Sequence, residues 1–303
     1  MNKKHIAIIV LACLAVFLAG CSGGESQGTA GSPFIGGTKG IVAEFEPLSI
    51  EESGVYTIYD TDTFPIQILL KNKGEEDVAV NDATVKIEGI YLNDFSPVPA
   101  SEKKNDELVE KISDVNADGG EVIVDFGSDV MYKPAILGEF VPLEILAKYT
   151  YKYKTTVSVP KVCFSDDIQD KTVCSVDGTK TSYSSGAPIQ VTSVDEKSAG
   201  SGKSALTFTV ENVGGGSSTV IGSEFNTRYD QVSYKIVPDT EAAKWKCRSA
   251  GRENEARFAD GKTTIVCELI DPVTDKYTKE VVLEISYEYR DFIQESLRIK
   301  KSS

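Results

Sequence analysis

An internal repeat with an offset close to 140 residues constrains the fold of this chain more than any other feature. Two segments end in the same kind of turn: residues 64–71 precede Asn72-Lys73-Gly74, and residues 205–211 precede Asn212-Val213-Gly214. Further matches join residues 122–126 to 264–268, Leu143-Glu144-Ile145 to Leu283-Glu284-Ile285, and the pair Tyr149 and Tyr151 to the pair Tyr287 and Tyr289. Because the matches keep the same order, the sequence indicates one domain that has been duplicated.

Both copies show the alternation of β-strands. Apolar residues recur with a period of two over residues 64–70, 143–151, 206–210 and 281–289. Short runs rich in Val, Ile, Thr, Tyr and Phe, separated by turn residues, are typical of a sandwich. The sequence therefore predicts an all-β protein with two tandem Ig-like β-sandwich domains. Helical spacing is scarce, and we expect helices only over residues 101–112 and around residues 240–245.

The N-terminus has the pattern of an export signal. Lys3 and Lys4 precede an apolar run over residues 6–18, which is shorter than the roughly 20 residues of a membrane-spanning helix. The run closes with Leu18-Ala19-Gly20-Cys21, which resembles the lipobox of prokaryotic lipoproteins. The resemblance implies that residues 1–20 are a signal peptide and that Cys21 is lipidated, which would anchor the protein outside the cell membrane. The alternative is an ordinary secretory peptide with an incidental cysteine.

The remaining cysteines agree with export. Four follow the lipobox, namely Cys163, Cys174, Cys247 and Cys267. An even number in an oxidising compartment predicts two disulfides, and we favour Cys163–Cys174 and Cys247–Cys267 because each pair lies within one expected domain. The alternative is four free, buried thiols.

The composition divides the chain into segments. Residues 21–40 hold Cys21 and a stretch rich in Gly, Ser and Thr, which predicts a flexible tether. Residues 41–174 would form the first sandwich and residues 188–303 the second. Residues 175–187 are rich in Ser, Thr and Gly, and we expect them to be the linker.

The expected strand order and the Asn-x-Gly turns at Asn72 and Asn212 resemble CARDB-type and related Ig-like domains of prokaryotic surface proteins. The resemblance covers most of residues 41–164 and 188–299 and implies the sandwich fold without any catalytic residue. The Phe34-Ile35-Gly36-Gly37-Thr38-Lys39-Gly40 segment is similar to one in uncharacterised secreted lipoproteins of small-genome archaea. Cys247 and Cys267 lie too close in sequence for the inter-sheet disulfide of antibody domains.

The charge argues against nucleic acid as a partner. The chain has 32 Lys and Arg against 46 Asp and Glu, for a net charge of −14. The expected leader contains two of the lysines and no acid, so the rest of the chain is close to −16. Binding to phosphates requires clustered positive charge, which this balance does not supply.

One short motif fits calcium. Asp114, Asn116 and Asp118 alternate before Gly119, and Asp125 stands at the twelfth position, as in an EF-hand loop. The second copy keeps Asp260-Gly261 but has Ala256 and Phe258 where oxygen ligands are required. We therefore favour a turn into a strand over a calcium site, which stays the alternative.

Other candidate sites have simpler explanations. The only histidine, His5, lies in the leader, so a nucleophile paired with histidine or a histidine metal ligand is not expected. Tyr149, Tyr151 and Tyr153 share one strand face and could form a platform for a sugar or peptide, but a core stripe is favoured. Trp245 is expected to pack on a disulfide.

These features together predict a non-catalytic, membrane-anchored surface lipoprotein that presents Ig-like domains for protein interaction, adhesion or envelope assembly. Its expected partners are the membrane, through the lipid on Cys21, and other envelope or surface proteins. No cofactor is expected. The alternatives are a ligand-capturing lipoprotein of a transport system and a surface module stiffened by calcium.

Overall fold

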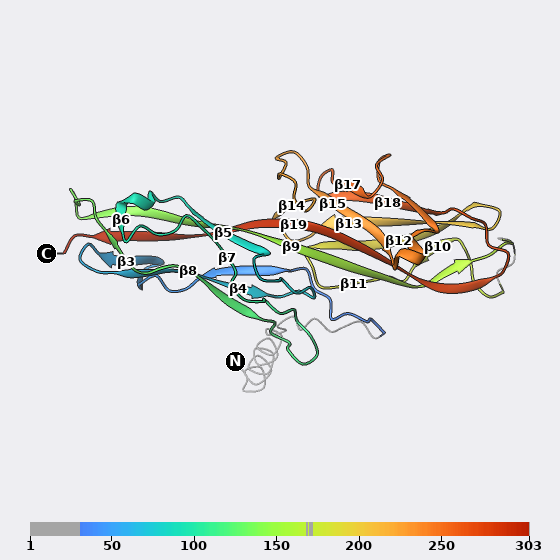
Figure 1. Ribbon diagram of the computed structural model, residues 1–303, viewed down its shortest axis with the longest axis horizontal. Coiled ribbons are helices and arrows are strands. Elements are labelled where there is room, and N and C mark those ends of the chain that lie inside the picture. Colours follow the sequence, from blue (N-terminus) through green and yellow to red (C-terminus); the bar gives the residue numbers. More distant parts are fainter. Residues whose placement is uncertain (1–30, 168, 170–171, 303) are drawn as a thin grey trace, which may run out of the picture.

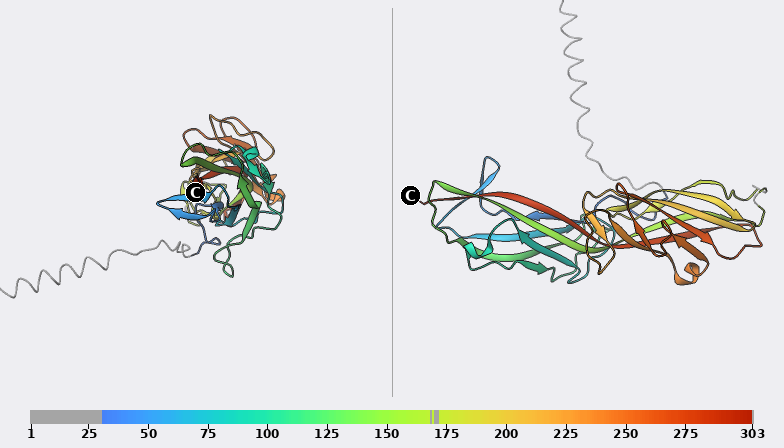
Figure 2. Two further views of the ribbon diagram at one scale, coloured as in Figure 1. Left: turned by 90° about the vertical axis from the view of Figure 1, so that its left-hand side faces the viewer. Right: turned by 90° about the horizontal axis from the view of Figure 1, so that it is seen from above.

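The computed structural model describes residues 31–167, 169 and 172–302 as an elongated all-β body of two sandwiches placed end to end (Figure 1). This confirms the predicted fold class. Figure 2 shows the same rod from the side and from one end. Apolar side chains at alternate strand positions fill one continuous core that extends through both sandwiches.

Two long strands run through the whole body. They are β9 (Phe140–Phe164) and β19 (Tyr277–Lys300), and they pair antiparallel along almost their full length, from Tyr277 opposite Phe164 to Lys300 opposite Phe140. The first part of β9 and the last part of β19 belong to the first sandwich, and the remaining parts belong to the second (Figure 1). Each sandwich is thus completed by a strand from the other half of the chain.

In the first sandwich, a four-stranded sheet packs against the sheet that contains the first part of β9 and the last part of β19. The four strands follow the order β1, β4, β8 and β6. On the opposite sheet, β5 pairs with β9 and β7, and β3 pairs with β19 and β2. The bounds are β1 (Ile41–Phe45), β2 (Ile50–Glu52), β3 (Val55–Tyr59), β4 (Phe64–Asn72), β5 (Ala83–Glu88), β6 (Phe95–Ser96), β7 (Glu102–Lys104) and β8 (Glu121–Tyr132), with a short 3-10 helix, η1 (Leu92–Asp94).

In the second sandwich, a five-stranded sheet packs against the sheet that contains the last part of β9 and the first part of β19. Its order is β10, β12, β13, β18 and β16. On the opposite sheet, β15 pairs with β19 and β17, β14 pairs with β19, and β11 pairs with β9. The bounds are β10 (Gly178–Lys180), β11 (Tyr183–Ser184), β12 (Ile189–Gly200), β13 (Lys203–Asn212), β14 (Ser217–Thr219), β15 (Gln231–Val237), β16 (Trp245–Arg248), β17 (Glu255–Arg257) and β18 (Lys262–Leu269). Two of these short strands, β10 and β11, lie in the segment expected to be the linker.

The helix predicted over residues 101–112 is wrong. That segment contains β7 and an irregular stretch in which Leu108 is exposed and Val109 is fully buried. The buried Asn105 amide donates to the carbonyls of Ala79 and Glu107, and its oxygen accepts from the Ala83 amide. These side-chain bonds to the backbone hold the loop against β5 in place of helical bonds. The second predicted helix is present as one turn, α2 (Asp239–Ala242).

Both expected disulfides are present, Cys163–Cys174 and Cys247–Cys267. Cys163 lies near the end of β9, and its bridge closes the loop that follows. Cys247 and Cys267 lie directly opposite each other on β16 and β18, within one sheet. The two bridges place the folded part in an oxidising, extracytoplasmic environment. Across the described ranges, no helix is long and apolar enough to cross a membrane.

Candidate functional site

Five tyrosines meet where β9 and β19 pass from one sandwich to the other. All are buried, with at most 5% of each side chain exposed, which confirms the prediction of a core stripe over a surface platform. Neighbouring rings of the group lie 5.4–6.4 Å apart between centroids. Such contacts stabilise the crossing point beyond simple burial. The five are Tyr149, Tyr151, Tyr153, Tyr287 and Tyr289.

Two of these tyrosines close the Asn-x-Gly turns of the repeat. The Tyr153 hydroxyl donates to Asn72 Oδ1 over 3.0 Å and accepts from the Glu76 amide over 3.3 Å. The Asn72 side chain also accepts from the Gly74 amide and donates to the Glu76 carbonyl. Buried polar groups require such partners, so each turn and its tyrosine form one unit.

The second sandwich contains the same unit. The Tyr289 hydroxyl donates to Asn212 Oδ1 over 3.0 Å and accepts from the Gly216 amide over 2.8 Å. Asn212 in turn bonds the Gly214 amide and the Gly216 carbonyl. Tyr153 is therefore the counterpart of Tyr289. The internal repeat pairs Tyr289 with Tyr151, which lies two residues before Tyr153 on the same strand face.

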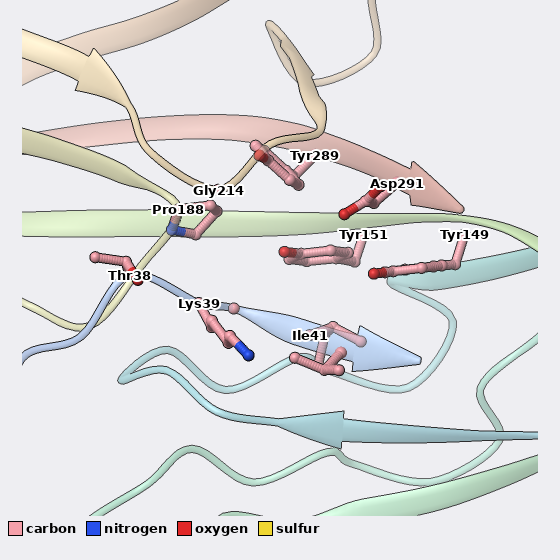
Figure 3. Close-up of a pocket in the computed structure, with 11 residues that line it drawn as sticks. Thr38, Lys39, Ile41, Tyr149, Tyr151, Pro188, Gly214, Tyr289 and Asp291 are labelled. Carbon is pink, nitrogen blue, oxygen red and sulfur yellow. The ribbon is translucent and has the colours of Figure 1, made fainter. Parts of the chain in front are cut away.

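A pocket of about 250 Å³ opens beside these tyrosines at the junction of the two sandwiches (Figure 3). Its walls come from the segment that leads into β1, from β9 and β19, and from the loop after β13. Lys39 lies exposed on one wall, and the half-buried Asp291 lies on another. Figure 3 shows the Tyr149 and Tyr151 rings side by side between them.

Tyr151 differs from its neighbours because its hydroxyl has no hydrogen-bond partner among the described residues. Its side chain is only 2% exposed, and burial raises the pKa of the phenol well above its usual value. The hydroxyl lies so close to Gly40 that a Cβ there would come within 2.7 Å of it. The pKa of the Tyr149 phenol is also raised, mainly because the side chain is buried. The Asp291 carboxylate beside it is the second cause.

A second polar cluster fixes the start of the folded chain at the same junction. The Glu75 carboxylate accepts from the amides of Ile35 (2.9 Å), Gly36 (2.8 Å) and Gly186 (2.6 Å). Glu75 follows β4 of the first sandwich, and Gly186 precedes β12 of the second. One side chain thus joins three separate segments, which we name the Glu75 clasp. The folded part includes Ile35 and Gly36, upstream of the expected start at Ile41.

A third polar cluster lies near the first disulfide. The Glu196 side chain is completely buried, accepts from the Cys163 amide at 3.1 and 3.2 Å, and lies 2.7 Å from Lys180 Nζ. Burial raises the pKa of Glu196. Trp245, expected to pack on a disulfide, makes an edge contact with Phe164, the residue after Cys163.

The four candidate calcium ligands are engaged elsewhere or exposed. Asp125 lies in β8, and its carboxylate accepts from the Gly127 amide over 2.8 Å and from the Ser128 hydroxyl over 3.1 Å. Asp114 and Asp118 are exposed, and Asn116 lies in the turn between them. In the parts of the chain that the structure covers, no three His, Cys, Asp or Glu residues are grouped to hold a metal.

The turn explanation has direct support in the backbone. Gly119 has φ +73°, and Asp260 and Gly261 of the second copy have φ +51° and +75°. A Cβ on Gly119 would lie 1.9 Å from the Asn72 carbonyl oxygen, so only glycine fits this turn. The shared Asp-Gly sequence is accounted for by chain reversal before a strand.

Cys21, the expected lipidation site, lies outside the described residues. No model of a known protein family matches the chain, and no curated protein matches it. The function therefore has to be argued from the fold and from the junction.

The sequence missed the Glu75 clasp and both charged walls of the pocket. One signal was available: Asp291 continues the inward alternation of Tyr287 and Tyr289, where an acid is unusual. Lys39 and Gly40 carried no such signal, because only the folded chain brings the segment before β1 to the strand crossing.

Proposed function

We propose that this protein is a non-catalytic, membrane-anchored surface lipoprotein that presents two Ig-like sandwiches to other proteins of the envelope. The observation that carries the proposal is the pairing of β9 with β19 through both sandwiches. A continuous strand pair and a shared core leave no hinge between the two halves, so the protein is built as one stiff rod with two separated ends.

The point of attachment supports a display role. The Glu75 clasp fixes the start of the folded chain at the waist of the rod and away from its ends. Cys21 and Gly31 are ten positions apart, and a chain of that length spans at most about 35 Å. A lipid on Cys21 would thus hold the rod near its middle and leave both ends exposed to partners.

The anchor can be tested first. Replacing Cys21→Ser should release the protein from the detergent phase or stall removal of the leader, while the matched Cys13→Ser change should leave partitioning unchanged. A Cys21→Ser protein that fractionates wholly with membranes would contradict the lipid anchor.

The display role is tested by photo-cross-linking in cells. A photoreactive residue is placed at Leu137 (100% exposed), in the loop before β9, and at Val173 (63% exposed), in the loop after β9. These loops lie at opposite ends of the rod. Val115 (97% exposed), in a turn near the clasp, is the control.

We expect at least one end position to yield a discrete adduct with another envelope protein, and Val115 to yield none. Adducts with a transport permease at an end position would favour the ligand-capturing alternative. The absence of any protein adduct, or the same adducts at all three positions, would contradict the display role.

A further inference from the structure

We propose that the junction pocket is a binding site for a small, uncharged, hydroxyl-rich ligand of the size of one sugar ring. The site is separate from the rod ends and does not depend on the proposed function.

The Tyr151 side chain is 2% exposed and lines the pocket. The hydroxyls of Tyr153 and Tyr289 on the same strand pair have two partners each, whereas that of Tyr151 has none among the described residues and lines the pocket. Among the described residues, Ser218 Oγ is the fully buried side-chain oxygen or nitrogen without a partner, so the Tyr151 hydroxyl reaches the pocket and is free to bond a molecule that enters it. A ligand hydroxyl in the pocket would supply the missing bond.

The opposite charges of Lys39 and Asp291 on the pocket walls favour an uncharged ligand with several hydroxyl groups. Asp291 accepts hydrogen bonds and repels anions, whereas Lys39 donates them and repels cations. A purely apolar ligand would leave the Tyr151 hydroxyl unsatisfied. Adjacent hydroxyl groups can donate to a carboxylate and accept from an ammonium at once, so a neutral polyol fits all three side chains.

The volume of the pocket limits the size of the ligand. Sites for drug-sized ligands have about 300–1,000 Å³, and this pocket, at about 250 Å³, is smaller. Two glycines keep it open: a Cβ on Gly40 would approach the Tyr151 hydroxyl, and a Cβ on Gly214 would lie 2.5 Å from Tyr289 Oη. The side chains of Tyr149, Tyr151 and Tyr289 line the pocket but are at most 5% exposed, so the polar groups of the walls would make most of the contacts with the ligand.

The test uses the full-length protein in a polyoxyethylene ether detergent, because glycoside detergents themselves carry sugars. Titration calorimetry and ligand-detected NMR are run with D-glucose, D-galactose, D-mannose and N-acetyl-D-glucosamine, and with L-alanine as a zwitterion of comparable polarity. The variants are Tyr151→Phe, which removes only the hydroxyl, and Asp291→Asn. Tyr132→Phe, far from the pocket in β8, is the matched control.

We expect saturable binding of at least one sugar, with affinity reduced tenfold or more in Tyr151→Phe and in Asp291→Asn and unchanged in Tyr132→Phe. Because the Tyr151 hydroxyl has no described partner, Tyr151→Phe should melt at or above the wild-type temperature, so its loss of binding would not reflect misfolding.

Three outcomes would overturn the assignment. The first is the absence of saturable binding of any sugar up to high millimolar concentration. The second is equal affinity in wild type and Tyr151→Phe. The third is binding of L-alanine in place of the sugars, which would show that the walls select a charged ligand.

Discussion

Removing the hydroxyl of Tyr153 tests whether the Asn-x-Gly turns are held by their tyrosines. Tyr153→Phe keeps the ring, so the aromatic contacts with Tyr151 and Tyr287 remain and no large cavity forms. Two hydrogen bonds are lost, to Asn72 Oδ1 and from the Glu76 amide. The Asn72 side chain, which is fully buried, keeps its bonds to other partners.

The expected loss follows from those two bonds. Each buried hydrogen bond contributes a net of about 1 kcal/mol, so Tyr153→Phe should lower the free energy of unfolding by about 2 kcal/mol. For a body of this size, that change corresponds to a decrease in melting temperature of roughly 4–8 °C. Tyr289→Phe, which loses bonds to Asn212 Oδ1 and from the Gly216 amide, should cost a similar amount.

Thermal unfolding followed by circular dichroism measures the loss, with urea unfolding at 25 °C as a second measure. Tyr151→Phe is the internal control, because it makes the same chemical change on the same face of the same strand where no described partner is lost. Equal destabilisation by Tyr151→Phe and Tyr153→Phe would refute the reasoning, since the cost would then come from the ring environment and not from the turn.

Three further predictions concern the clusters around the junction and the second sandwich. Breaking Cys247–Cys267 by Cys→Ser changes at both positions should cost about 3 kcal/mol by the loop-entropy model, and peptide mapping without reduction should recover the bridge beforehand. Lys180→Met should cost about 3–5 kcal/mol, because it leaves the buried Glu196 carboxylate unpaired. Burial raises the pKa of Glu196, so folding favours its protonated form and the loss measured by urea unfolding should shrink as the pH falls. Millimolar calcium should leave the melting temperature unchanged, and a rise abolished by Asp114→Ala would restore the calcium site.

The sequence was sufficient for the fold class but not for the path of the chain. Alternation of apolar residues identifies strands whatever their length, which is why the sandwich was predicted. It does not show where a strand passes from one sheet partner to the next. Strands average about 5–6 residues, whereas β9 has 25 and β19 has 24, so two sandwiches sharing one strand pair were not anticipated.

The site was predictable only in part. The tyrosines were correctly assigned to the core because they alternate along a strand and recur in both copies. Which hydroxyl has partners depends on turns far away in the sequence, and the Tyr153 hydroxyl meets an asparagine 81 residues earlier. The matching of Tyr151 with Tyr289 was off by two residues for the same reason: such a shift keeps the strand face, so periodicity cannot detect it.

Because β9 and β19 each belong to both sandwiches, the first sandwich cannot complete its folding until the last part of β19 has been made. The last part of β19 pairs in parallel with β3, and Lys300 bonds Glu52 across 248 positions of sequence. A chain exported N-terminus first therefore brings the first sandwich into the oxidising compartment with one strand position empty, and residues 291–300 fill it only after the second sandwich has been made. Such distant pairings form slowly and leave a sheet edge unprotected in the interval. Truncation before residue 290 would therefore remove a strand from the first sandwich, the half of the rod that is made first.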